Sequence, residues 1–303
     1  INPVMLPDTV GVVSRNQKPG RGDLRAWKSP TTVATVPSGR ETIYRMGRDV
    51  DSDAQYWLSW TTAVNVVRGF DANDTTEQTF YTGDGAPKFT NNVIGLATAP
   101  YPTASRPMGI PAPIGAPTVA GTNSGATSPV IEYYYYVYTY VNSLGWESAP
   151  SPVSALVTRD NLGYTDISGF SSVPSGNYDI ASIRIYRTQG SSTGTDFYFL
   201  REITIATTST TDNNQTLGEN LATKFWFPAP GVPTGGATSI TEPTLSNLTA
   251  MWNGMMSGIS GNSVRICEPY TPYAWPATYE IIPPDSKPVG LGVFGQTLLV
   301  LTT

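Results

Sequence analysis

Three alternating aspartates, Asp49, Asp51 and Asp53, form the segment of this sequence that comes closest to a metal site. A calcium loop places carboxylates at this spacing, then needs a glycine at the sixth position and a bidentate glutamate at the twelfth. Ala54 and Trp60 stand at those two positions. The segment is therefore predicted to be a polar hairpin turn, since Asp favours turns, and no metal ligand is predicted.

The residue types also limit the possible catalytic chemistry. The chain has no histidine and one cysteine, Cys267, which excludes Ser/His and Cys/His nucleophile pairs and cysteine-rich metal sites. Cys267 is predicted to be a small packed side chain. Paired carboxylates remain as an alternative for glycan cleavage, but they must stand roughly 5–10 Å apart, and no sequence spacing links any two candidates. These candidates are Glu132, Glu147, Asp160, Asp166, Asp179 and Asp196. The chain is predicted not to be an enzyme and to need no cofactor.

The charge balance gives no overall basic surface. The 303 residues include 18 Lys and Arg against 23 Asp and Glu, for a formal net charge of −5. Electrostatic capture of nucleic acid or of an anionic membrane needs the opposite sign. No apolar stretch is long enough for a membrane helix, so no membrane anchor is predicted.

Six tyrosines fall within the ten residues "EYYYYVYTYV", from Glu132 to Val141. Strand side chains alternate, so two apolar faces are expected, one on the core and one against something else. The second face is predicted to meet the rest of the molecule or a neighbouring subunit. The alternative is a strand covered on both sides within one thick core. The predicted interface residues are Tyr133, Tyr135, Val137, Phe225 and Trp226.

The elements that must position these residues are predicted to be strands throughout. Period-two segments between turn residues recur along the chain, and no helical periodicity survives the 29 Gly and 26 Pro. "YTGDG" around Asp84 is predicted to be a glycine-dependent turn. Residues 101–117, rich in Pro, are predicted to be an extended linker, and a second Pro/Gly linker follows at 225–237.

This pattern predicts three parts in an all-β chain. Residues 1–100 form a meander of short strands, 101–228 contain a β-sandwich with a Pro-edged hairpin, and 229–303 return to short strands. The sandwich is thus expected to be inserted into a platform built by both ends of the chain.

Two flanking stretches resemble the tail nozzle proteins of short-tailed bacteriophages, also called tail tubular protein B or tail accessory factor. They are "DLRAWKSPTTVATVPSGRETIYRMGRDVDSDAQYWLSW" and its continuation to "APKFT", and "GNSVRICEPYTPYAWPATYEIIPPDSKPVGLGVFGQTLLVLTT". The middle segment, "YYYYVYTYVNSLGWESAPSPVS" with "SIRIYRTQGSSTGTDFYFLREI", is similar to the immunoglobulin- and fibronectin-type-III-like modules of phage virion proteins.

The resemblance implies a β-propeller-like platform and a homo-oligomeric, six-fold ring in the virion tail, made in the host bacterial cytoplasm. Its implied partners are other tail and portal-adaptor proteins and the genome DNA, which passes through the lumen without specific binding. As the resemblance implies, members of that family continue with further strands after such a final segment. Either residues 1–303 are therefore expected to be a portion of a longer polypeptide, or this member closes its platform differently. The alternative to a ring-forming conduit protein is a receptor- or glycan-binding tail module.

Overall fold

The computed structural model describes residues 17–19, 24–26, 32–47, 56–190, 196–221 and 244–303. Within these residues the chain is all-β, as predicted, and its one named helical element is the three-residue 3₁₀ helix Ala277–Tyr279. No helix in the described part of the chain is long and apolar enough to cross a membrane.

The amino-terminal strands form small antiparallel sheets. Four strands share one sheet in the order β5-β6-β7-β8. The bounds are Gln17–Pro19 (β1) with Leu24–Ala26 (β2), Thr42–Arg45 (β3) with Trp57–Trp60 (β4), and Asn65–Arg68 (β5), Thr79–Thr82 (β6), Lys88–Thr90 (β7) and Arg106–Pro107 (β8). The turn after β6 depends on glycine as predicted, because Gly83 and Gly85 both have positive φ and a Cβ on Gly83 would meet the Ala63 carbonyl oxygen at 2.2 Å.

The predicted linker at 101–117 is not free chain over its first half. Arg106 pairs with Phe89 in the sheet, and Met108 is 1% exposed while its N–H donates to the Pro87 carbonyl at 3.0 Å. The prediction failed because Pro107, which lacks an N–H, is accommodated at the end of a two-residue edge strand. Residues 101–110 therefore pack on the amino-terminal sheet.

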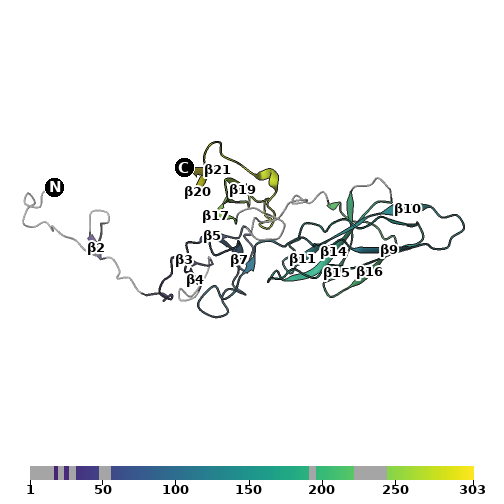
Figure 1. Cartoon of the computed structure of the whole chain (residues 1–303). Helices are drawn as coiled ribbons and strands as arrows, with labels where there is room; N and C mark the ends of the chain where they lie inside the picture. The colour runs from purple at the N-terminus through teal and green to yellow at the C-terminus, as the bar shows by residue number, and fades with distance from the viewer. Residues whose placement is uncertain (1–16, 20–23, 27–31, 48–55, 191–195, 222–243) are drawn as a thin grey trace, which may run out of the picture.

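The carboxy-terminal strands contact the amino-terminal ones. Strand β17 lies beside β5 and β6, and the Leu248 N–H donates to the Thr82 hydroxyl at 3.2 Å (Figure 1). Phe80 and Trp275, each 1% exposed, belong to the same hydrophobic cluster. The bounds are Ser246–Ala250 (β17), Met256–Ser260 (β18) and Ser263–Ile266 (β19) in one sheet, and Pro288–Phe294 (β20) with Thr297–Thr302 (β21) in a hairpin. We call the body formed by β3–β8 and β17–β21 the central body.

The middle of the chain forms two three-stranded sheets that project from the central body (Figure 1). The inner side chains of both sheets, such as Tyr136 and Ile167, share one core cluster. One sheet has the order β11-β14-β15, with Tyr136–Asn142, Ile180–Thr188 and Phe197–Thr204; the other has β16-β13-β9, with Ser209–Asp212, Tyr164–Ser168 and Thr118–Thr122. Strands β10 (Ile131–Tyr134) and β12 (Val157–Asp160) form a separate pair. We call this two-layered part the sandwich.

The tyrosine segment is therefore two strands, not one. It breaks at Tyr135, where its pairing changes from β12 to β14. The change of partner strand depends on residues far along the chain, which the local alternation does not encode.

Three serines complete the free edge of β11. In the Pro-containing segment 147–155, the N–H of Ser151 donates to the Tyr138 carbonyl at 2.8 Å, and its Oγ accepts from the Tyr138 N–H at 3.1 Å. Ser148 makes the same pair of bonds with Tyr140, and Ser154 with Tyr136. Serines three residues apart thus satisfy the backbone hydrogen bonds of the β11 edge. A regular strand rich in proline could not do so, because proline has no backbone N–H.

Candidate functional site

The inner face of the tyrosine strand explains why these side chains are tyrosine and not phenylalanine. Tyr134, Tyr136, Tyr138 and Tyr140 are at most 3% exposed, and their hydroxyls reach polar partners. The Tyr138 hydroxyl accepts from the Ser171 N–H at 2.7 Å, and the Tyr140 hydroxyl donates to the Ser171 carbonyl at 2.9 Å. Each ring supplies apolar area while its hydroxyl remains hydrogen-bonded.

A buried charge cluster fastens the two sheets of the sandwich together. Asp212 is fully buried and accepts from Arg187 Nη1 at 2.6 Å and from the Tyr136 hydroxyl at 2.8 Å. The guanidinium carbons of Arg159 and Arg187 lie 4.5 and 4.6 Å from the ring centroid of Tyr134. The pKa of Tyr134 is raised to about 12, mainly because the ring is buried and secondly because its hydroxyl is hydrogen-bonded to Glu132. Since the charged groups are paired with one another, we assign this cluster a structural role.

The outer face of the tyrosine strand is covered, as predicted. Along β11, however, the covering residues belong to the sandwich itself and not to the central body. Val137 is 2% exposed and packs with Tyr186 and Leu221. Tyr133 and Tyr135 are half-buried. For β11 this arrangement corresponds to the alternative of one thick core. The other two predicted interface residues, Phe225 and Trp226, lie outside the described residues.

Glu147 organises the polar groups of this outer face. Glu147 is 2% exposed, and its carboxylate accepts hydrogen bonds from the Thr139 hydroxyl at 2.7 Å, from Arg184 Nη1 at 2.8 Å and from the Tyr186 hydroxyl. The pKa of Tyr186 is raised, mainly by burial and secondly by the negative charge of Glu147. Arg184 extends the network outward, because its Nε donates to Glu202 at 2.8 Å.

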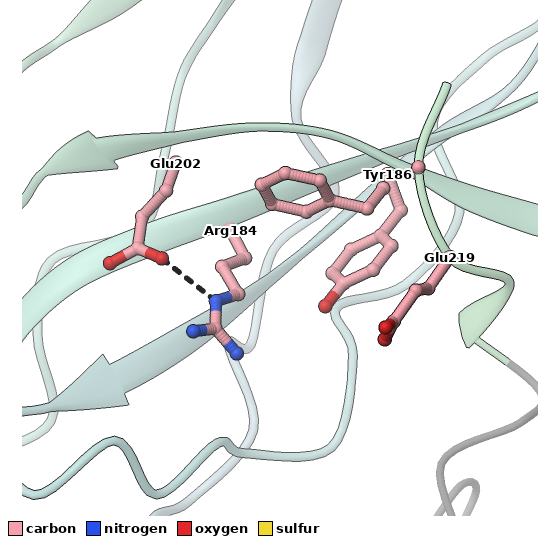
Figure 2. Close-up of a pocket in the computed structure, with 6 residues that line it drawn as sticks. Arg184, Tyr186, Glu202 and Glu219 are labelled. Atoms are coloured by element: carbon pink, nitrogen blue, oxygen red, sulfur yellow. Dashed lines mark hydrogen bonds and ion pairs between the residues drawn. The ribbon is translucent and has the colours of Figure 1, made fainter. Parts of the chain in front are cut away.

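A pocket of about 350 Å³ opens on this face. Arg184 and Tyr186 come from β14, Phe199 and Glu202 from β15, and Gly218 and Glu219 from a segment that lies along the edge of β15 (Figure 2). Segment 218–220 is held there because the Gly218 N–H donates to the Phe199 carbonyl at 2.7 Å and the Phe199 N–H donates to the Glu219 carbonyl at 2.8 Å.

A β-bulge gives the pocket its composition. The register between β14 and β15 shifts after Ile185, so Arg184 pairs with Glu202 but Tyr186 pairs with Phe199. Phe199 and Glu202 are three residues apart and would face opposite sides of a regular strand. The bulge at Leu200, which is 5% exposed in the core, brings both to the outer face. Alternation in "SIRIYRT" places Arg184 and Tyr186 together, but no sequence signal indicated this bulge.

Trp146, which follows β11, joins the sandwich to the central body. It is 7% exposed, and its ring centroid lies 4.7 Å from that of Phe89, 5.2 Å from that of Tyr273 and 6.2 Å from that of Phe80. An ion pair between Arg106 and Asp179 at 2.7 Å accompanies this aromatic contact. The junction therefore combines one buried anchor with one polar contact.

The six carboxylates considered for catalysis do not gather into a site. Glu147 alone borders the pocket network, and Asp196 is exposed. Glu132 contacts the Tyr134 hydroxyl, Asp160 the Ser124 N–H, Asp166 the Thr211 hydroxyl and Asp179 Arg106. Asp49, Asp51 and Asp53 lie outside the described residues, and no group of His, Cys, Asp and Glu within those residues is placed to hold a metal ion. Cys267 is fully buried, which confirms the prediction of a packed thiol.

The sequence matches no protein-family model and no curated protein.

Proposed function

We propose that this chain is a structural, non-enzymatic subunit of a bacteriophage tail that assembles with copies of itself into a six-fold ring around the path of the ejected DNA. In this proposal the central body is a propeller-like platform, and the sandwich is an inserted fibronectin-III-like module. Other tail and portal-adaptor proteins are its neighbours in the virion.

The observation that carries the proposal is the apolar surface of the β20–β21 hairpin. Phe294 is 79% exposed, Leu301 63% and Leu299 49%. Within the described residues β21 pairs with β20 alone, so its outer edge offers unpaired backbone groups beside these side chains. Such an edge favours pairing with another strand, either from further residues of the same polypeptide or from a second copy of the chain, and our proposal assigns it to a second copy.

The charge of the chain supports a conduit. A net charge of −5 disfavours tight phosphate binding by counterion release, so a duplex can slide past the wall. The half-buried Tyr133 and Tyr135 are a second proposed contact surface, since tyrosine is enriched in interfaces.

The test compares the hydrodynamic size of three proteins by sedimentation velocity. Wild type is expected to sediment as an oligomer, and the double variant Leu299→Ser, Leu301→Ser as smaller species. Ile114→Ser is the matched control, because Ile114 is 87% exposed outside the hairpin. If the hairpin variant assembles like wild type, the exposed surface of the β20–β21 hairpin is not the assembly contact, and the proposal loses the observation that carries it.

The alternative function is a receptor- or glycan-binding tail module. The pocket beside Phe199 is the observation that favours it. Monomers or trimers that bind a glycan array would support this alternative over the ring.

A further inference from the structure

The pocket on the outer face of the sandwich has an apolar wall of aromatic rings. Tyr186 is 1% exposed and supports Phe199, with their ring centroids 5.9 Å apart in an edge-to-face arrangement. Phe199 is half-buried, so part of its ring borders the pocket. The volume of about 350 Å³ is at the lower end of the range for small-ligand sites.

Beside this wall, Arg184 and Glu202 offer a donor next to an acceptor (Figure 2). Arg184 uses Nε on Glu202 and Nη1 on Glu147, and its Nη2 makes no hydrogen bond within the described residues. The oxygens of Glu202 each accept one bond, from Ser182 at 2.5 Å and from Arg184, and each carboxylate oxygen can accept another. Two neighbouring hydroxyl groups match this pair, because one can accept from the guanidinium while the other donates to the carboxylate.

The charge of the lining selects against anions. Arg184 contributes one positive charge, which the ion pair with Glu202 balances. The buried carboxylate of Glu147 lies behind Arg184 and adds negative potential. Phosphate, sulfate and acidic sugars are therefore disfavoured relative to an uncharged ligand.

We propose that this pocket binds a neutral hexopyranose unit of a glycan. The apolar C–H face of the sugar ring packs on Phe199, whose π face is the negative part of its quadrupole. Two adjacent hydroxyls of the sugar bind Arg184 and Glu202. This site is independent of the ring assembly proposed above, because its lining residues come from the sandwich alone.

The test is NMR titration of the whole protein with the methyl glycosides of glucose, galactose, mannose and N-acetylglucosamine at millimolar concentrations. At least one of them is expected to shift the amide signals of β14 and β15 saturably. Phe199→Leu and Glu202→Gln should each weaken that binding about tenfold, the equivalent of about 1.4 kcal/mol. Glu202→Gln is the safer variant for folding, because Arg184 keeps its bond to Glu147.

Matched controls come from the other sheet of the sandwich. Tyr164→Leu and Asp166→Asn remove an exposed aromatic ring and an exposed carboxylate on β13, and should leave sugar binding unchanged. The proposal is overturned if no glycoside shifts these signals, or if both pocket variants bind like wild type. It is also overturned if tetramethylammonium or guanidinium saturates the pocket and the sugars do not, because the site would then be one for cations.

Discussion

Replacing Ser151 with alanine tests the serine-completed edge of β11. Ser151 is 5% exposed, and its Oγ accepts from the N–H of Tyr138, a residue with no exposed surface. Alanine keeps the backbone bond of residue 151 to the Tyr138 carbonyl but leaves the Tyr138 N–H buried without an acceptor. An unsatisfied buried donor costs about 1–3 kcal/mol, so the free energy of unfolding should fall by that amount. Ser148→Ala and Ser154→Ala remove the equivalent acceptors for Tyr140 and Tyr136 and should behave alike.

The assay is urea unfolding followed by tryptophan fluorescence, with Ser172→Ala as the control. Ser172 is exposed, so its substitution should change stability by less than about 0.5 kcal/mol. The Ser151 variant should lower the urea midpoint without changing the slope, since the surface exposed on unfolding is the same. If Ser151→Ala and Ser172→Ala unfold at the same midpoint, the hydroxyl acceptors do not hold this edge and the reasoning is refuted.

Three further predictions concern the junction, pH and the thiol. Trp146→Ala should cost about 3–5 kcal/mol and separate unfolding of the sandwich from that of the central body in calorimetry; one unshifted transition would contradict the anchoring role. Burial alone would raise the pKa of Asp74, but hydrogen bonds from Thr76 and Gln78 lower it overall. The ionised Asp74 therefore stabilises the folded protein fully above the ordinary carboxyl pKa, and this stabilisation is lost as the pH falls through the lower pKa of the folded state. The stability difference between wild type and Asp74→Asn should therefore shrink in acid, and an unchanged difference would count against these bonds. Burial raises the pKa of Cys267 to about 12, so a thiol reagent should label it only on unfolding, and rapid labelling of the folded protein would disprove its burial.

Local patterns in the sequence predicted the parts of the fold that depend on local chemistry. Alternation and aromatic content predicted an all-β chain and a tyrosine strand covered on both faces, and β11 is buried along its whole length. The turn around Asp84 was predictable because Gly83 and Gly85 meet a backbone requirement within a few residues.

Features that depend on distant pairing were not predictable. The break at Tyr135 arises because β10 and β11 join different partner strands, and the strand at Arg106 forms because β7 offers a free edge. The pocket depends on the bulge at Leu200, which brings Phe199 and Glu202 to one face. Only Glu147 of its network was among the residues selected from the sequence, as one of six unconnected acids.

The central claim is that this chain is a ring-forming subunit, and negative-stain electron microscopy of the purified protein tests it most directly. We predict closed rings with six-fold symmetry in which the β20–β21 hairpins are covered by neighbouring copies. Images that contain only elongated monomers or trimers at every protein concentration would contradict the account.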